Sequence, residues 1–89
     1  PYTKVSVPCA DHAKVDAMAR LAETLPDRFP EASVDDEYGV RLELPDASWV
    51  LVRPSGTEPY LRIYAESEDV ETLSEAAKTV VEDAIADAE

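Results

Sequence analysis

The sequence is poor in the residue types that staple a fold or build a metal site. Its 89 residues include one cysteine and one histidine. A single cysteine cannot form a disulfide within the chain and suits a reducing compartment, so we expect a cytoplasmic protein in which Cys9 is buried or incidental. His12 has no Cys or His partner at ligand spacing, which favours a solvated first-turn residue over a base or a metal ligand.

Long hydrophobic runs are also missing. No stretch of roughly eighteen apolar residues and no signal-like segment occurs, so nothing in the sequence indicates a membrane or secretion. The length allows one small domain. Because the chain begins at Pro1 without an initiator Met, we expect it to be a piece of a longer protein.

Positive charge is scarce, with 8 basic residues against 20 acidic ones and a net charge of −12. This balance makes nucleic acid and anionic membranes poor partners. Disorder is disfavoured because 45% of the residues are hydrophobic and fall in periodic blocks. A calcium loop is disfavoured because no Asp-x-Asp-x-Asp-Gly pattern occurs, and we expect no metal site. We favour a halophilic cytoplasm, where molar salt shortens the Debye length to ~3 Å and screens the repulsion.

The N-terminal third predicts an extended segment and then a helix. Residues 1–8 alternate in polarity and are expected to form an extended linker or entry segment. Asp11 is the expected N-cap of a helix that runs to about Leu25, where Pro26 should end it. Its expected inner stripe is Val15, Met18, Ala19, Ala22 and Leu25.

The rest of the chain switches to a period of two and then back to a helix. Strands are expected near 33–35 (weak), 40–44, 49–53 and 60–67, followed by a helix over about 69–86. In the last strand, Leu61, Ile63 and Ala65 should face the helices, and Tyr60, Arg62 and Tyr64 the opposite side. The order predicts an α+β domain over 9–89, with a small antiparallel-rich sheet of about four strands and two helices packed on one face.

One short string combines groups that suit a phosphate monoester: Arg53-Pro54-Ser55-Gly56-Thr57-Glu58-Pro59. A guanidinium offers a planar fork of donors, and the two hydroxyls add more. We expect Gly56 to take a positive φ and to turn backbone N–H groups into an anion-binding nest. From residue types alone, a solvated turn with Arg53 paired to Glu58 is an equal alternative.

This string, preceded by Trp49-Val50-Leu51-Val52 and continued by Leu61-Arg62-Ile63-Tyr64, resembles the C-terminal domain of the α-D-phosphohexomutases. That superfamily includes the phosphoglucomutases, phosphomannomutases and phosphoglucosamine mutases. The resemblance implies a TATA-box-binding-protein-like architecture and a role in binding the phosphate at the non-reacting end of a hexose phosphate. It makes Arg53 the bidentate ligand, Ser55 and Thr57 hydroxyl donors and Gly56 a backbone contact. Glu58 and Arg62 are the expected supporting residues.

The resemblance further implies an enzyme that interconverts hexose 1- and 6-phosphates through a phosphoserine and a bisphosphorylated intermediate. The phosphoserine and a magnesium ion would belong to other domains, so this chain alone should be inactive. Its partners would be the hexose phosphate and those domains. We favour phosphomannomutase or phosphoglucomutase over phosphoglucosamine mutase, although the string is shared by all three. A stand-alone sugar-phosphate-binding or regulatory module, and a structural domain whose loop is only a turn, remain open.

Overall fold

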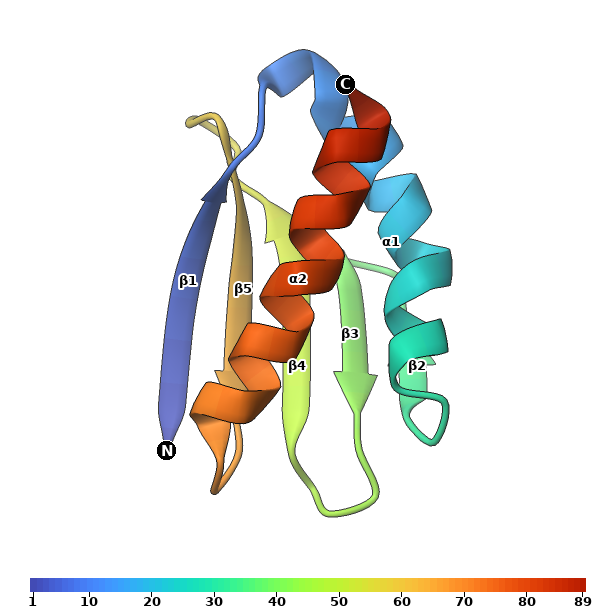
Figure 1. Ribbon diagram of the computed structural model, residues 1–89, viewed down its shortest axis with the longest axis vertical. Helices are drawn as coiled ribbons and strands as arrows, with labels where there is room; N and C mark the ends of the chain where they lie inside the picture. Colours follow the sequence, from blue (N-terminus) through green and yellow to red (C-terminus); the bar gives the residue numbers. More distant parts are fainter.

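The computed structural model describes residues 1–89 as one antiparallel sheet with both helices on the same face (Figure 1). The strands are ordered β1-β5-β4-β3-β2. The predicted α+β fold is confirmed. The elements in chain order are β1 (Tyr2–Pro8), a 3₁₀ turn η1 (Asp11–Ala13), α1 (Lys14–Arg28), β2 (Ser33–Asp35), β3 (Val40–Glu43), β4 (Trp49–Pro54), β5 (Tyr60–Glu66) and α2 (Val70–Ala88).

The sheet has five strands rather than about four, because the expected linker is part of it. β1 pairs with β5 along its whole length, from Tyr2 opposite Glu66 to Pro8 opposite Tyr60. The alternation of polar and apolar residues in this segment is that of a strand with one buried face: Val7 lies in the core, and Val5 packs against the core. The segment is therefore an edge strand and not a linker.

The two faces of the sheet differ in the way that the alternation predicts. On β4, Val50 and Val52 are fully buried beneath the helices, and β4 lies in the centre of the sheet. On β5, the predicted division is confirmed: Leu61, Ile63 and Ala65 are buried, whereas the alternate residues are half-buried on the other side. We call that uncovered side the open face.

The first helix begins and ends later than predicted. Asp11 makes no side-chain cap and lies in η1, and α1 continues past Pro26 to Arg28. A proline in the last turn costs the helix one backbone hydrogen bond, and its fixed φ is compatible with the helix. The helix is then closed by the N–H of Phe29, which donates to the carbonyl oxygens of Leu25 and Pro26, both at 3.2 Å.

The buried stripe of α1 shares only Leu25 with the predicted one. The side chains in the core are Ala13 at the end of η1 and Ala17, Leu21 and Leu25 on α1, at a spacing of four. Val15 is 84% exposed, and Met18 and Ala22 lie only at the flank of the core. Ala13 and Ala17 are small, so the start of α1 can approach the rest of the core closely. Val15 and Met18 are then left at the side of the helix.

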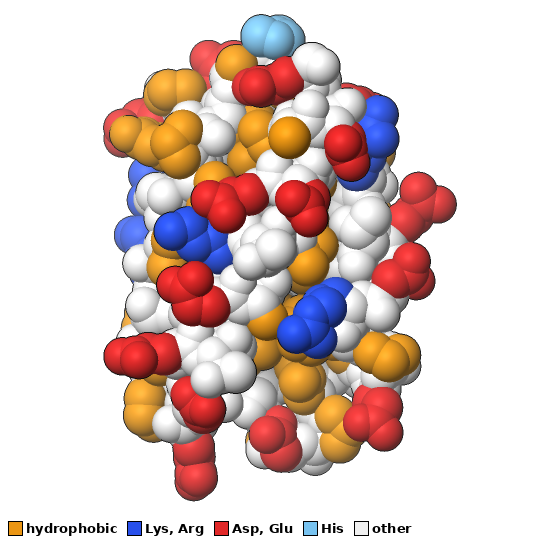
Figure 2. Space-filling view, in the orientation of Figure 1, with side chains coloured by type: hydrophobic (Ala, Val, Ile, Leu, Met, Phe, Trp, Pro, Cys, Tyr) orange, Lys and Arg blue, Asp and Glu red, His pale blue; other side chains and the backbone are white.

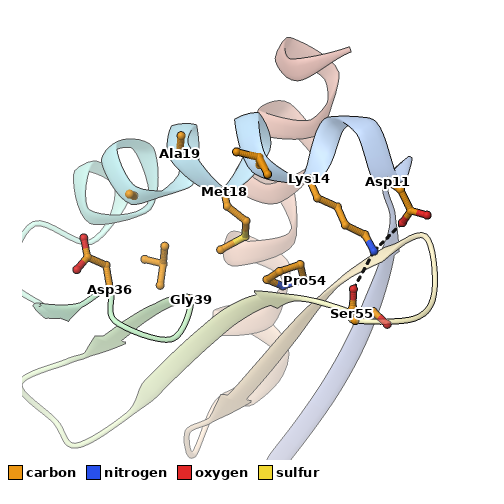
Figure 3. Close-up of a pocket in the computed structure, with 12 residues that line it drawn as sticks. Asp11, Lys14, Met18, Ala19, Asp36, Gly39, Pro54 and Ser55 are labelled. Carbon is orange, nitrogen blue, oxygen red and sulfur yellow. Dashed lines mark hydrogen bonds and ion pairs between the residues drawn. The ribbon is translucent and has the colours of Figure 1, made fainter.

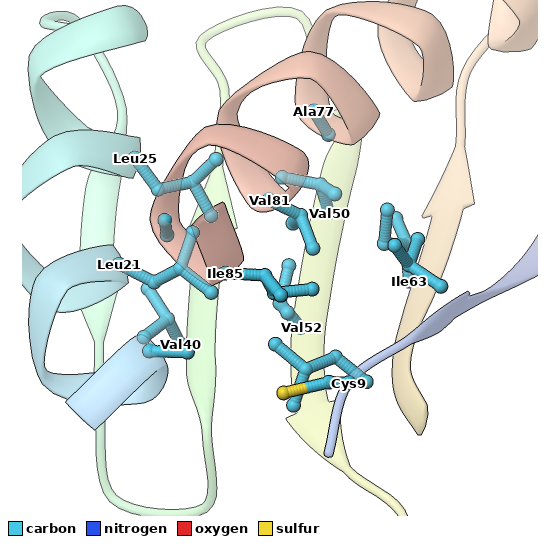
Figure 4. Close-up of a cluster of buried hydrophobic side chains, with 14 of the residues drawn as sticks. Cys9, Leu21, Leu25, Val40, Val50, Val52, Ile63, Ala77, Val81 and Ile85 are labelled. Carbon is cyan, nitrogen blue, oxygen red and sulfur yellow. The ribbon is translucent and has the colours of Figure 1, made fainter. Parts of the chain in front are cut away.

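A single hydrophobic core of 18 buried residues fills the space between the sheet and the helices. Figure 4 shows Leu21 and Leu25 from α1 meeting Val81 and Ile85 from α2 above the strands. The second helix follows its prediction closely, and the Asp69 carboxylate accepts a hydrogen bond from the N–H of Thr72 at 3.3 Å. That cap fixes its start.

The surface of the helix layer is strongly acidic. Figure 2 shows Asp and Glu side chains scattered over both helices rather than gathered at one place. Neither helix is long and apolar enough to cross a membrane.

Candidate functional site: the loop between β4 and β5

The string that carries the motif forms the connection between the two central strands. β4 ends at Pro54 and β5 begins at Tyr60. The N–H of Ser55 donates to the carbonyl oxygen of Tyr60 at 3.0 Å, which closes the base of the loop. We call residues 53–59 the 53–59 loop.

Ser55 organises this loop from inside. Its side chain is buried, and Oγ accepts hydrogen bonds from the N–H groups of Thr57 at 3.4 Å and Glu58 at 3.1 Å. Such hydroxyl-to-backbone bonds define a turn by themselves. The Ser55 hydroxyl proton has no acceptor within the chain, so Ser55 can still donate to a ligand while it holds the turn.

Gly56 does not have the predicted positive φ. A Cβ built on Gly56 would meet nothing within 4 Å. The expected nest that depends on left-handed backbone is therefore wrong. What the loop offers instead is an exposed Gly56 N–H with no acceptor in the chain, next to an exposed Thr57 hydroxyl that also has none.

The glycine that needs its conformational freedom is Gly39, in the turn that precedes β3. It has a φ of +102°, and a Cβ on it would lie 2.5 Å from the Val52 carbonyl oxygen and 2.9 Å from the Arg53 Cβ. The turn before β3 thus presses against the backbone that carries Arg53. A glycine that ends a turn signals a possible positive φ, but the sequence gives no sign of this contact with β4.

Arg53 lies on the open face at the loop end of β4. Its guanidinium is over the ring of Tyr64, with Cζ 5.4 Å from the ring centroid, and it makes no ion pair. The alternative interpretation, a turn held by an Arg53–Glu58 pair, does not apply, because the Glu58 carboxylate lies 3.9 Å from Nη2 of Arg62. Arg62 is directly opposite Arg53 across the two strands. Glu58 and Arg62, the two expected supporting residues, are therefore paired with each other.

The open face holds half of the eight cationic side chains of the chain. They are Lys4 on β1, Arg41 on β3, Arg53 on β4 and Arg62 on β5. Three of them lie over aromatic rings of the same face, at 5.1–5.8 Å from the ring centroids. These contacts hold the cations above the sheet. Arg41 is also paired with Glu43 and Arg62 with Glu58, so Lys4 and Arg53 are the cations of this face that make no ion pair.

Sequence reasoning missed Lys14, which reaches the 53–59 loop from the first residue of α1. Its Nζ donates to the carbonyl oxygens of Ser55 at 2.8 Å and Glu58 at 2.6 Å, and forms an ion pair with Asp11 at 2.8 Å. Figure 3 shows the ammonium group between Asp11 and Ser55, with α1 above the loop. No local pattern could have announced a contact between residues 41 and 44 positions apart.

A cavity of about 640 Å³ lies between α1 and the loop, beside Lys14. The apolar flank of α1 forms one wall, and Figure 3 shows Met18 pointing into the space toward Pro54. Gly39, Ser55 and Gly56 form part of the opposite wall. Four of the five side chains that were predicted to face the core, Val15, Met18, Ala19 and Ala22, therefore line a hollow behind the loop.

No cluster of three or more His, Cys, Asp or Glu side chains that could hold a metal ion occurs in the chain.

Cys9 lies next to the far end of the loop. The Cys9 thiol is buried, and burial together with the Glu89 carboxylate raises its pKa above the ordinary value. The backbone N–H of Cys9 donates to the Pro59 carbonyl at 2.8 Å, so this residue supports the far end of the loop.

Comparison with known protein families shows to which family the chain belongs. Residues 5–83 match the family described as phosphoglucomutase/phosphomannomutase, C-terminal domain. The chain belongs to this family. The match includes the second half of β1, all of α1, the whole 53–59 loop and most of α2, so Lys14 and every residue of the loop lie within it.

Relatives with the name "probable phosphoglucosamine mutase" are similar to the chain over most of its length. One from Methanothermobacter thermautotrophicus is 50% identical over 72 residues, which are 80% of this chain and 16% of that protein. Another from Methanopyrus kandleri is 48% identical over 77 residues, 84% of this chain and 16% of the relative. A third from Pyrococcus abyssi is 41% identical over 85 residues, 89% of this chain and 18% of the relative. The chain thus spans less than a fifth of these proteins.

Proposed function

We propose that this chain is the phosphate-binding domain of a phosphohexomutase, and that the 53–59 loop binds the phosphate at the non-reacting end of the substrate. The observation that carries the proposal is the cluster of unpaired donors at the loop, within a chain that belongs to the family. Arg53 makes no ion pair, and the Gly56 N–H and the Thr57 hydroxyl have no acceptor. Exposed donors beside an unpaired guanidinium fit a phosphate dianion.

Each residue of the loop has a distinct part in this proposal. Arg53 leaves the ring of Tyr64 and binds two phosphate oxygens with its planar fork. Gly56 donates its N–H, and the open space around its Cα lets an oxygen approach the backbone. Thr57 donates its hydroxyl, while Ser55 holds the turn and donates its remaining proton. Arg62 keeps the Glu58 carboxylate away from the arriving anion.

The phosphate bound here would orient a reaction that takes place elsewhere in the parent protein. A phosphoserine and a magnesium ion in other domains would transfer the phosphoryl group between the 1- and 6-positions of a hexose. Holding the far phosphate uses binding energy remote from the reacting atoms to position them. Since Arg53 and Arg62 lie on the open face, that face would be turned toward the substrate and the helix layer away from it.

The remaining composition fits a cytoplasm of high salt. An excess of acidic residues on the helix layer is tolerated where molar salt screens their repulsion. The same charge would keep nucleic acid and anionic membranes away from the helix layer. The parent protein would therefore work as a cytoplasmic enzyme of carbohydrate metabolism.

The names of the relatives put glucosamine phosphates first among the substrates to test, followed by mannose and glucose phosphates. All three present the same phosphate to the 53–59 loop, and no residue of the loop distinguishes the sugars. The substrate of the parent enzyme should be measured directly, by comparing kcat/KM for the three sugar phosphates.

The test of the proposed function is Arg53→Ala in the full-length parent enzyme. Loss of a charge-assisted hydrogen-bond pair, about 2–3 kcal/mol, should lower kcat/KM by about 30- to 150-fold. Arg53→Lys should recover only part of this, because a point charge cannot reproduce the fork. The matched control is Arg20→Ala, which removes an exposed helix arginine whose partner is Asp16. Wild-type kinetics in Arg53→Ala would remove Arg53 from the site and leave the loop as a turn.

A further inference from the structure

Lys14 is bonded to the 53–59 loop more completely than a surface lysine requires. Its three ammonium protons have three acceptors: the carbonyl oxygens of Ser55 and Glu58, and the carboxylate of Asp11. Only 13% of the Lys14 side chain is exposed, against 77% for Asp11. A lysine normally keeps its charged end in water. Here the charge lies under the loop, and the water-facing partner is the carboxylate.

The bond to Ser55 determines where the next N–H points. The peptide between Ser55 and Gly56 is planar and trans, like every other peptide bond of the chain. In such a peptide the C=O and the N–H point in opposite directions. Because the Ser55 carbonyl points at the Lys14 ammonium, the Gly56 N–H points away from it, toward the outside of the loop.

The bond also strengthens that N–H as a donor. A cation on the carbonyl oxygen polarises the peptide and makes the N–H at its other end more positive. The Gly56 N–H has no acceptor in the chain, so the bond from Lys14 is the only hydrogen bond that the Ser55–Gly56 peptide group makes. In a chain with a net charge of −12, a mostly buried cation beside the loop also offsets the repulsion that an anion meets on approach.

We propose that Lys14 is a positioning residue of the phosphate site: it aims and polarises the Gly56 N–H and supplies positive charge behind the loop. This inference rests on the proposed function, because it concerns the same site. It adds a residue from another element, 41 positions away in the sequence, that touches no substrate and acts through the backbone of the loop.

The chain offers a simple spectroscopic test, because it contains only two glycines. Labelling with ¹⁵N-glycine gives one amide signal from Gly56 in the loop and one from Gly39 as an internal reference. The variants are Lys14→Met, which keeps the length and loses the charge, and Lys14→Arg, which keeps the charge but presents a planar fork. Lys78→Met removes a lysine from α2 and is the control for net charge. Asp11→Asn leaves the bonds from Lys14 to the loop in place and is the control for local perturbation.

Without ligand, in molar potassium chloride, Lys14→Met should move the Gly56 signal and leave the Gly39 signal in place. In titrations with glucosamine 6-phosphate, the dissociation constant of the Lys14→Met variant should be about tenfold or more above that of the wild type. The dissociation constant of Lys14→Arg should lie between the two. Lys78→Met and Asp11→Asn should keep the wild-type Gly56 signal, and Lys78→Met the wild-type affinity. In the parent enzyme, Lys14→Met should raise KM for the sugar phosphate.

The outcomes separate the two proposals. A Lys14→Met variant with an unchanged Gly56 signal and unchanged affinity overturns the inference, even if its unfolding midpoint falls, because the lysine is then only structural. If Lys14→Met does not fold, Lys14→Arg replaces it, and a wild-type Gly56 signal and affinity in that variant overturn the inference. If the wild type itself does not respond to glucosamine 6-phosphate, and Arg53→Ala leaves the parent kinetics unchanged, the proposed function fails. The comparison of the Gly56 signal between wild type and Lys14→Met without ligand still decides whether Lys14 determines the direction and polarisation of the Gly56 N–H.

Discussion

The two glycines of the chain should respond to the same substitution in opposite ways. At Gly39, an alanine must adopt a φ of +102° and place its Cβ 2.5 Å from the Val52 carbonyl oxygen. At Gly56, the φ is not positive and the added Cβ would meet nothing within 4 Å. Gly39→Ala and Gly56→Ala therefore form a matched pair that differs only in the surroundings of the methyl group.

The expected loss at Gly39 can be worked out from these two terms. A non-glycine residue in this backbone region costs about 1–3 kcal/mol, and forcing a carbon into a filled space costs about 1–3 kcal/mol more. Alanine restricts the unfolded chain and returns about 0.4–1 kcal/mol. The net expectation is a loss of about 1–5 kcal/mol, out of about 4–13 kcal/mol for a domain of this length. At Gly56 only the last term applies, so Gly56→Ala should be neutral or stabilising by up to about 1 kcal/mol.

The assay is urea unfolding in molar potassium chloride, followed by the fluorescence of Trp49, the only tryptophan. Equal midpoints for the two variants, or a lower midpoint for Gly56→Ala, would refute the reasoning. A second measurement connects the strain to the site. Because the Gly39 methyl would also lie 2.9 Å from the Arg53 Cβ, Gly39→Ala should weaken sugar-phosphate binding in conditions where it is folded.

Three further outcomes are expected. Ala47 has a φ of 71°, so Ala47→Gly should raise the free energy of unfolding by about 0.5–1 kcal/mol, and a lower urea midpoint would contradict this. The wild-type chain should gain stability as potassium chloride rises toward molar concentration, whereas a flat response would remove the halophilic interpretation. Since burial raises the pKa of Cys9, less thiolate is present at any given pH than in the unfolded chain, and alkylation near pH 8 should be slower than in urea. Equal rates in the two conditions would argue against a buried thiol.

The sheet and the second helix could be predicted because their burial follows the local period. In β5, alternate residues go to opposite faces whatever lies above them, so Leu61, Ile63 and Ala65 were assigned correctly. In α2, the Asp69 cap and the apolar spacing both mark the same helix. These signals depend on neighbours within a few residues, which the sequence displays directly.

The errors come from features that depend on distant partners. In α1, both faces carry apolar residues, and the choice of the alanine face over Val15 depends on how closely the helix can approach the core. The positive φ was predicted for Gly56 and occurs at Gly39, because only the contact of Gly39 with β4 shows which glycine needs a special backbone. Of the candidate site, the loop could be found from its residue types, but the Lys14 contact required the fold.

The pairing of β1 with β5 has a mechanical consequence for the whole domain. β1 runs along β5 to Pro8, opposite Tyr60, and the N–H of the next residue, Cys9, is bonded to Pro59. Since residues 2–8 are held in the sheet, they cannot bend as a tether between domains. A rotation of this domain within its parent protein would turn the sheet and the 53–59 loop as one rigid piece. Under the proposed function, a phosphate bound by the 53–59 loop would move together with the sheet, about a pivot that lies outside it.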